Sequence, residues 1–112
     1  MWNTTSKQIL TQSLKYKLYK LSLKSYLMKE FIDKLKSMGL TEYEAKAYLA
    51  LLQKANMTAE QISNLSEVPL PRVYGVLEQL AIKGFIKILP GRPRKFEAIE
   101  PRIAFESYMK YK

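Results

Sequence analysis

The stretch TAEQISNLSEVPLPRVYGVLEQLAIKG, residues 58–84, predicts two short helices joined by a turn. Thr58 followed by Gln61 is a capping pair, which marks the start of the first helix. The apolar residues expected on the buried face of this helix are Ile62 and Leu65. Residues 67–70 are assigned to the turn that follows.

The second helix of this stretch begins with Pro71, which fits the first helical position because no backbone N–H is needed there. Gly84 ends it. The residues expected to face inward are Val73, Val76, Leu77 and Leu80. Two helices separated by about four turn residues match a helix-turn-helix unit.

Another helix is predicted upstream of this unit, from Thr41 to Gln53. Thr41 opens it as an N-cap, and Glu44 three residues later completes a capping box. Apolar residues recur at helical spacing and predict one buried face, made of Ala45, Tyr48, Leu49 and Leu52. A polar break at residues 54–57 separates this helix from the next.

The N-terminal segment, residues 3–37, is predicted to be a basic amphipathic helix that runs into a neutral one, and Gly39 ends it in the place of a C-terminal glycine. Its apolar residues alternate in the four-three spacing of a coiled-coil seam, and only Ser25 interrupts them. They are Leu14, Leu18, Leu21, Met28, Ile32 and Leu35. Before Met28 the lysines come without any acid, which indicates a basic amphipathic helix.

After Gly84 the apolar period changes from helical to alternating, which predicts two strands at residues 85–89 and 94–99. Residues 90–93, PGRP, are turn residues, so the strands form a hairpin. Pro101 then starts a last amphipathic helix. The apolar residues of this helix that need a partner surface are Ile103, Ala104, Phe105, Tyr108 and Tyr111.

The order helix, helix, turn, helix, hairpin predicts a winged helix-turn-helix fold, mainly α with a small β-hairpin. Amphipathic helices are added at the N-terminus and the C-terminus. We expect a basic helical extension that is a candidate for dimerisation (residues 1–37) and a winged helix-turn-helix domain (38–100). The C-terminal helix (101–112) is a second candidate for dimerisation.

Composition narrows the function classes. The 112 residues include 19 Lys and Arg against 10 Asp and Glu, a formal net charge of +9. This charge favours a polyanionic partner, with nucleic acid first and an anionic membrane surface second. Without cysteine or histidine, the chain lacks thiolate nucleophiles, imidazole bases and the usual zinc ligands. Glu42 and Glu44 fit the first turn of a helix better than acid-base catalysis. We expect no enzyme, no metal and no cofactor.

Residues 1–28 interleave Leu and Tyr with Lys and contain no continuous apolar run. Neither a signal peptide nor a membrane span fits such a segment. The expectation is a cytoplasmic protein with no membrane partner.

The charged residues from 83 to 96 are all cations, namely Lys83, Lys87, Arg92, Arg94 and Lys95. Contact with DNA phosphates is their expected role, because the run carries positive charges only and adjoins the second helix of the predicted helix-turn-helix. The alternative is a solvated hairpin whose charges serve solubility.

The run MGLTEYEAKAYLALL, residues 38–52, resembles the start of the DNA-binding domain in the TrmB family of archaeal transcription regulators. Later segments resemble the recognition helix, strand and wing of that family in the same order. They are residues 72–74 with Leu77 and Leu80, residues 83–86, and Gly91, Arg92, Pro93, Phe96 and Pro101. The resemblance covers residues 32–105 and implies a winged helix that binds double-stranded DNA to regulate transcription.

The predicted recognition helix, residues 70–83, departs from this family. A basic residue and a small hydroxyl are usual where Leu70 and Pro71 stand, so fewer donors remain to read bases in the major groove. The residues left for DNA contact are Arg72, Tyr74, Gly75 and Gln79, together with Lys87, Arg92, Arg94 and Lys95 of the wing, residues 86–99. Arg72 is expected to pair with guanine, while the wing contacts the backbone or the minor groove.

Two of these helix residues have specific expectations. Tyr74 is expected to reach a phosphate, and the alternative is an aromatic residue at the edge of the core. Gly75 leaves room for close approach to the duplex.

Full members of the family carry a C-terminal sugar-binding domain, whereas this sequence ends at Lys112, so no small-molecule effector is expected. The two terminal helices predict a homodimer with recognition helices about 34 Å apart, or a multiple of that, on the duplex. One alternative is that the N-terminal seam packs on its own domain. Another is that Met28 is the true start and a basic tail precedes it.

The leading hypothesis is therefore a sequence-specific, dimeric DNA-binding regulator of transcription. A non-specific architectural DNA-binding protein is the second, favoured by the acid-free N-terminus and the depleted recognition helix. A winged-helix module that docks another protein is the third.

Overall fold

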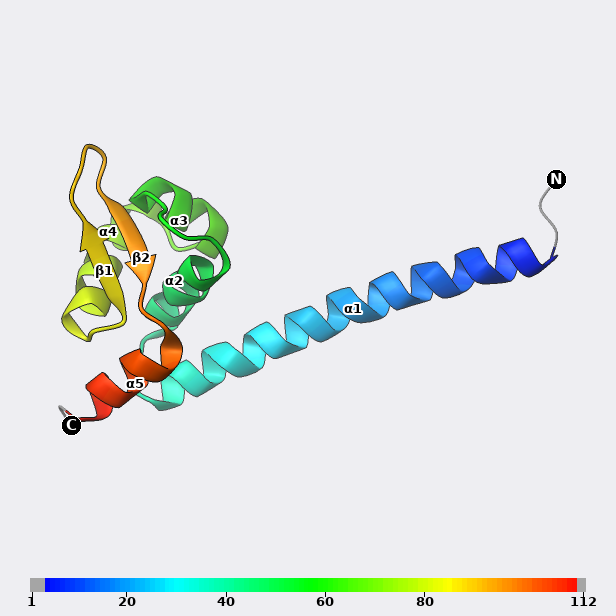
Figure 1. The fold of residues 1–112 in the computed structure, drawn as a ribbon, viewed down its shortest axis with the longest axis horizontal. Coiled ribbons are helices and arrows are strands. Elements are labelled where there is room, and N and C mark those ends of the chain that lie inside the picture. The colour runs from blue at the N-terminus through cyan, green and yellow to red at the C-terminus, as the bar shows by residue number, and fades with distance from the viewer. Residues whose placement is uncertain (1–3, 111–112) are drawn as a thin grey trace. The chain divides into compact units, whose positions relative to one another are not determined.

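The computed structural model describes the backbone of residues 4–110 and the side chains of residues 14, 15, 17, 18 and 20–110 (Figure 1). Its elements are α1 (Thr4–Ser37), α2 (Glu42–Gln53), α3 (Ala59–Ser66), α4 (Leu70–Ile82), β1 (Ile86–Leu89), β2 (Lys95–Ala98) and α5 (Pro101–Lys110). Their order is that of the predicted winged helix-turn-helix. The chain divides into two compact units, residues 1–34 and residues 35–112.

The core of the second unit is formed mainly by the inward faces of α2, α3 and α4. All four residues predicted to face inward from α4 are buried, namely Val73, Val76, Leu77 and Leu80. Two other predictions were wrong, because Leu52 and Leu65 are 37% and 46% exposed. In α3 the buried row is instead Ala59, Ile62 and Ser66, and Leu65 lies one position off that row.

Both predicted capping boxes are present. In α2, Glu44 N–H donates to Thr41 Oγ1 (3.1 Å) and Thr41 N–H donates to Glu44 Oε1 (2.8 Å). In α3, Thr58 and Gln61 make the same reciprocal pair. Gly39, which follows α1, has a φ of 112°, a backbone conformation that favours glycine and ends the helix.

The turn of the helix-turn-helix is held by two serine side chains. Ser63 Oγ donates to the Val68 carbonyl (2.6 Å), while Ser66 Oγ accepts from Val68 N–H (3.2 Å). Val68 itself is buried, so the turn is fixed from both sides. The helix after it begins at Leu70, as in the predicted range 70–83, and Pro69 is its N-cap, so Pro71 takes the second helical position and not the first. Pro71 is tolerated at the second position because backbone N–H groups of a first helical turn have no partner within the helix.

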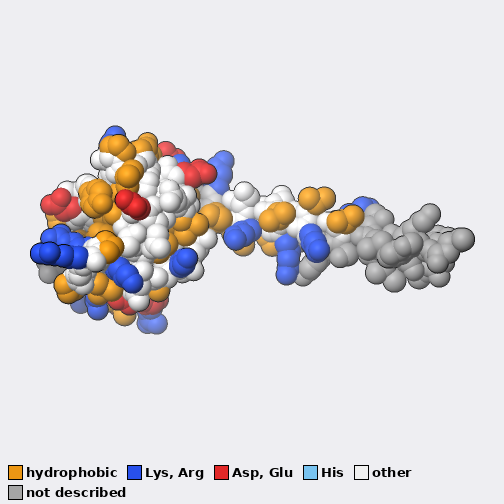
Figure 2. All heavy atoms as spheres, turned by 90° about the horizontal axis from the view of Figure 1, so that it is seen from above, with side chains coloured by type: hydrophobic (Ala, Val, Ile, Leu, Met, Phe, Trp, Pro, Cys, Tyr) orange, Lys and Arg blue, Asp and Glu red, His pale blue; other side chains and the backbone are white. Residues whose placement is uncertain are grey.

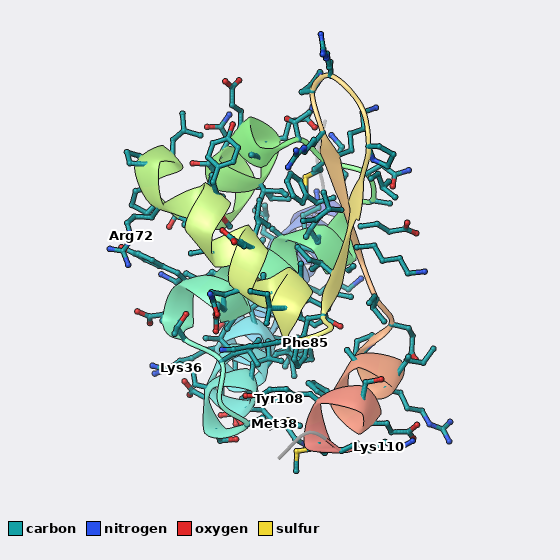
Figure 3. All side chains as sticks on the ribbon, turned by 90° about the vertical axis from the view of Figure 1, so that its left-hand side faces the viewer. Lys36, Met38, Arg72, Phe85, Tyr108 and Lys110 are labelled. Atoms are coloured by element: carbon teal, nitrogen blue, oxygen red, sulfur yellow. The ribbon has the colours of Figure 1, made fainter. Side chains whose placement is uncertain are left out.

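The hairpin pairs β1 with β2 in antiparallel register, with Ile86 opposite Ala98 and Ile88 opposite Phe96. Phe96 is buried, and its N–H donates to the Met57 carbonyl (2.9 Å), which ties β2 to the loop between α2 and α3. The tip of the hairpin extends beyond the helices (Figures 1 and 3). In the tip, Gly91 has a φ of 151°, and a Cβ on it would lie 3.2 Å from the Pro93 carbonyl oxygen.

An aromatic cluster closes the end of this unit opposite the hairpin tip. Phe85 is its centre and makes edge-on contacts, with centroid distances of 5.3 Å to Tyr48, 5.6 Å to Phe105 and 5.5 Å to Tyr108. Figure 3 shows Phe85 and Tyr108 facing each other between the core and α5. Tyr48 also donates its hydroxyl to the Ile99 carbonyl (2.6 Å). Burial, and then the carboxylate of Glu100, raises the pKa of Tyr48 above its usual range, so this donor stays protonated.

The buried apolar face of α5 includes fewer residues than predicted. Ala104 is buried, and Phe105 and Tyr108 are half-buried against Phe85. Ile103 is 57% exposed, because it lies one position away from Ala104 and on the solvent side of the helix. Tyr111 lies outside the described residues. Within residues 4–110 no helix has the length and apolar character needed to cross a membrane.

Glu44 combines the cap of α2 with a partly buried ion pair. Glu44 is 3% exposed, and its Oε1 also accepts a hydrogen bond from Lys83 Nζ at 2.7 Å. Lys83 is the residue that follows α4. Lys83 Nζ donates in addition to the Gly39 carbonyl (3.3 Å). One carboxylate therefore connects the start of α2, the end of α4 and the turn that follows α1.

We expect Glu44→Ala to lower the free energy of unfolding by roughly 2–3 kcal/mol, because it removes a cap and leaves Lys83 without its carboxylate. Gln61→Ala is the matched control, since it removes the same position of the exposed capping box and is expected to cost roughly 0.5–1 kcal/mol. Chemical denaturation of both variants measures the difference. Equal losses would contradict a stabilising role for the Glu44 ion pair.

Candidate nucleic-acid interface

The eight residues predicted to contact DNA are all exposed on α4 or on the hairpin. On α4 they occupy different sides of the helix. Tyr74 lies on the side toward the hairpin, whereas Arg72 and Gln79 lie on the side toward α2, and Gly75 lies between. The four predicted contacts on α4 are therefore one cation, one amide, one aromatic ring and a bare backbone position.

Arg72 is held by an aromatic contact with α2. Its guanidinium carbon lies 5.4 Å from the centroid of the Tyr43 ring, which is the geometry of a cation–π contact. Figure 3 shows the Arg72 side chain extending outward from the first turn of α4. Stacking on a ring face leaves the N–H groups at the edge of the guanidinium available. Arg72 is thus oriented before any ligand binds.

A groove of about 770 Å³ separates α4 from the hairpin. Its walls include Tyr74 and Glu78 of α4, Glu60 of α3, and Ile88, Arg94 and Phe96 of the hairpin segment. The structure thus brings together two of the predicted contacts, Tyr74 and Arg94, across one groove. Tyr74 is 60% exposed, so its side chain is not part of the core.

The other wing cations do not face this groove. Lys87 is opposite Glu97 and Lys95 is opposite Leu89 in the hairpin register. Residues that are opposite in antiparallel strands share a face, and faces alternate along each strand. Lys87 and Lys95 therefore lie on the face away from Ile88 and the groove. Arg92 is exposed in the turn.

Lys83 was expected among the phosphate-binding cations, and the structure places it elsewhere. Its ammonium is engaged by Glu44 and by the Gly39 carbonyl, inside the second unit. The sequence interval between the two partners is 39 residues, so no local pattern signals the pairing.

Sequence reasoning also missed the acidic groups of the groove, Glu60 and Glu78. The helical period set by the buried residues of α4 does place Glu78 on its exposed side. No such signal brings Glu60 next to it, because Glu60 comes from α3 and the groove forms only when three segments pack. Ile82, at 70% exposed, is a further apolar group on the outer surface of α4.

A family model described as the sugar-specific transcriptional regulator TrmB matches residues 35–102. The HTH-type sugar sensing transcriptional regulator TrmBL1 of Pyrococcus furiosus is 41% identical over 80 residues, which are 71% of this chain and 24% of that protein. The chain thus spans about a quarter of the length of this relative.

Solved structures that are similar to this fold include a chromatin protein and a transcriptional regulator. One is TrmBL2, described as an archaeal chromatin protein with a novel mode of DNA binding, with a TM-score of 0.71 and 33% identity over 75% of this chain and 33% of that one. The other is a MarR family transcriptional regulator from Silicibacter pomeroyi, with a TM-score of 0.57 and 20% identity over 84% and 71% of the two chains. The predicted winged helix-turn-helix fold is confirmed by these matches.

Gly75 offers a test that separates folding from binding. A Cβ added there would meet no atom within 4 Å, and glycine inside a helix costs roughly 0.5–1 kcal/mol relative to alanine. We expect Gly75→Ala to raise the thermal midpoint of unfolding. The same change should weaken binding to duplex DNA severalfold, because a methyl group would hold α4 away from the bases at the floor of the DNA major groove. Calorimetry and fluorescence anisotropy measure the two effects. Unchanged binding would contradict close approach at Gly75.

Proposed function

Since the chain belongs to the TrmB family of transcriptional regulators, we propose that it binds double-stranded DNA through α4 and the hairpin and so regulates transcription. The observation that carries this proposal is the cationic hairpin beside an exposed helix of a winged helix-turn-helix. The charged residues of the turn are Arg92 and Arg94, and both are exposed. The turn lies at the tip of the hairpin, which extends away from the core of the unit (Figure 1). A surface of this kind fits the phosphate backbone.

The contacts divide by side of the interface. With α4 in the major groove, Arg72 and Gln79 are the donors nearest the base edges, and Arg72 pairs with guanine. Tyr74 reaches a phosphate from the groove wall. Lys87, Arg92, Arg94 and Lys95 of the wing contact the flanking backbone or the minor groove, with Lys87 and Lys95 on its outer face. No small-molecule effector is part of this proposal.

A non-specific architectural role is the second candidate. It is supported by the similarity to TrmBL2, described as an archaeal chromatin protein, and by the few polar groups on α4. Selection of bound fragments from genomic DNA at two salt concentrations distinguishes the two roles, because only a regulator enriches particular sites over bulk duplex. No binding to any duplex would refute both.

We further propose that the chain is a homodimer, with the helices of residues 1–37 and 101–112 as candidate contacts. Leu14, Leu18 and Leu21 are 61%, 66% and 65% exposed and lie in four-three spacing on α1. Figure 2 shows hydrophobic and basic side chains together along the described part of this helix. Such a seam is suited to a second copy of itself.

The positions beside this seam carry a particular charge pattern. The heptad positions e and g flank the seam, and five of them fall between residues 15 and 29. Ser22 occupies one, and lysines occupy the other four, namely Lys15, Lys17, Lys24 and Lys29. Parallel pairing would bring Lys24 near the second copy's Lys29, and antiparallel pairing would also bring like flanks together. Association of two copies is therefore opposed by charge repulsion, which salt screens.

Substitutions on α4 and the wing test the division of contacts. We expect Arg72→Ala to reduce the preference for a selected site over random duplex. Arg94→Ala and Lys95→Ala should instead weaken binding to every duplex and flatten the salt dependence by roughly one unit each. Titrations of selected and random duplex at several salt concentrations measure this. Equal losses on both duplexes for Arg72→Ala would contradict base reading by that residue.

The seam predicts an unusual salt dependence for the dimer. Self-association should strengthen as NaCl rises from low to moderate concentration, and Leu18→Asp should abolish it by placing a charge in the seam. In a parallel pair, Lys17→Glu with Lys24→Glu should strengthen association at low salt, because the new carboxylates would face lysines of the other flank, whereas Lys20→Glu, off the seam, should change it little. Sedimentation equilibrium measures each variant. A chain that stays monomeric at all salt concentrations would refute the dimer.

A further inference from the structure

Glu78 is a carboxylate on the helix that we place in the major groove. Buried Val76, Leu77 and Leu80 fix the inner side of α4, so the period of the helix leaves Glu78 on the outer side together with Gly75 and Ile82. Glu78 is exposed, and it lines the groove between α4 and the hairpin. Among the described residues, no hydrogen bond or ion pair involves its side chain.

The neighbouring acid Glu60 has a structural explanation, and Glu78 does not. Glu60 lies in the first turn of α3, where the unpaired N–H groups and the helix dipole stabilise negative charge. Glu78 lies well beyond the first turn of α4. The residues one turn away from it, Tyr74 and Ile82, carry no cation that would pair with it.

A carboxylate at this position is unfavourable for general attraction to DNA. It repels the phosphates, so a protein that held every duplex equally would bind more tightly without it. A carboxylate does, however, accept a hydrogen bond from the N4 amino group of cytosine, the one base whose major-groove edge offers only a donor. A charge that weakens binding to all sequences but rewards one base contributes specificity.

The surface beside Glu78 permits such a contact. Gly75 is one turn before it on the same side, and a Cβ there would meet no atom within 4 Å. The backbone of α4 can therefore approach the bases closely, which a side chain as short as glutamate requires.

We propose that Glu78 is a specificity-determining residue, which reads the N4 amino group of a cytosine in the major groove. The inference rests on the proposed function, because it needs α4 to enter that groove. Arg72 and Glu78 would then read opposite partners of G·C pairs from the two sides of one helix.

The test is selection from a random duplex library with the full chain and three variants. We expect the unmodified chain to enrich a cytosine at one position of each half-site by at least about fivefold, the low end for one good base contact. Glu78→Gln should shift that position toward adenine, because an amide pairs with adenine N6 and N7. Glu78→Ala should lose the preference there and keep the others. Glu60→Gln, with the same charge change on the facing wall, should keep the cytosine.

The alternatives give different results. If Glu78→Gln and Glu60→Gln tighten binding equally on every sequence, Glu78 is a repulsive charge only and the inference is overturned. If Glu78→Gln and Arg94→Ala are non-additive on random duplex, the carboxylate positions the arginine across the groove instead, which also overturns it. Duplex binding without any enrichment overturns base reading but leaves DNA binding intact. No duplex binding by the unmodified chain refutes the proposed function itself.

Discussion

Phe85 is the residue on which the geometry of the candidate interface depends. It lies three residues after the end of α4 and directly before β1, and it is fully buried, with ring contacts to α2 and α5. Its N–H donates to the Leu80 carbonyl, and its carbonyl accepts from Ile99 N–H, both at 2.9 Å. The end of α4 and both ends of the hairpin therefore meet at one residue, and aromatic contacts of about 0.5–1.5 kcal/mol each hold it there.

This arrangement gives the hairpin a fixed base and a free tip. At the base, Phe85 sets the direction in which β1 leaves α4, and the Phe96 to Met57 hydrogen bond holds β2 against the helices. Residues 90–95 of the tip are all exposed, its arginines included. The groove beside α4 consequently has one wall set by the core and one wall that ends in solvent. Such a site combines a wall held by the core with exposed charges at the end of the other wall.

The sequence predicted the local features of this chain well and the long-range ones poorly. Capping boxes at Thr41 and Thr58 are visible because both partners lie within one helical turn. The pairing of Glu44 with Lys83 is not visible, since the partners are 39 residues apart and each has a plausible local role. The prediction that Leu52 and Leu65 are buried was wrong. An apolar pattern gives the period of a helix, but packing decides how the helix is rotated about its axis and so which residues face the core. For the site, the exposure of Arg72 follows from that period, whereas the sequence left Tyr74 open between exposure and the edge of the core. The contact of Arg72 with Tyr43 and the placement of Glu60 and Glu78 on one groove arise only in the packed domain.

The tip of the hairpin also bears on how such a chain can evolve. Residues 90–95 are all exposed, so most substitutions there leave the core untouched, and surface changes of that kind are usually close to neutral for stability. Gly91 is the exception, because its backbone conformation and the nearby Pro93 carbonyl leave little room for a side chain. If the gene is duplicated, copies that keep this glycine are therefore free to diverge in the charge of the tip, and so in the ligands that they bind. They need no compensating mutations in the core first.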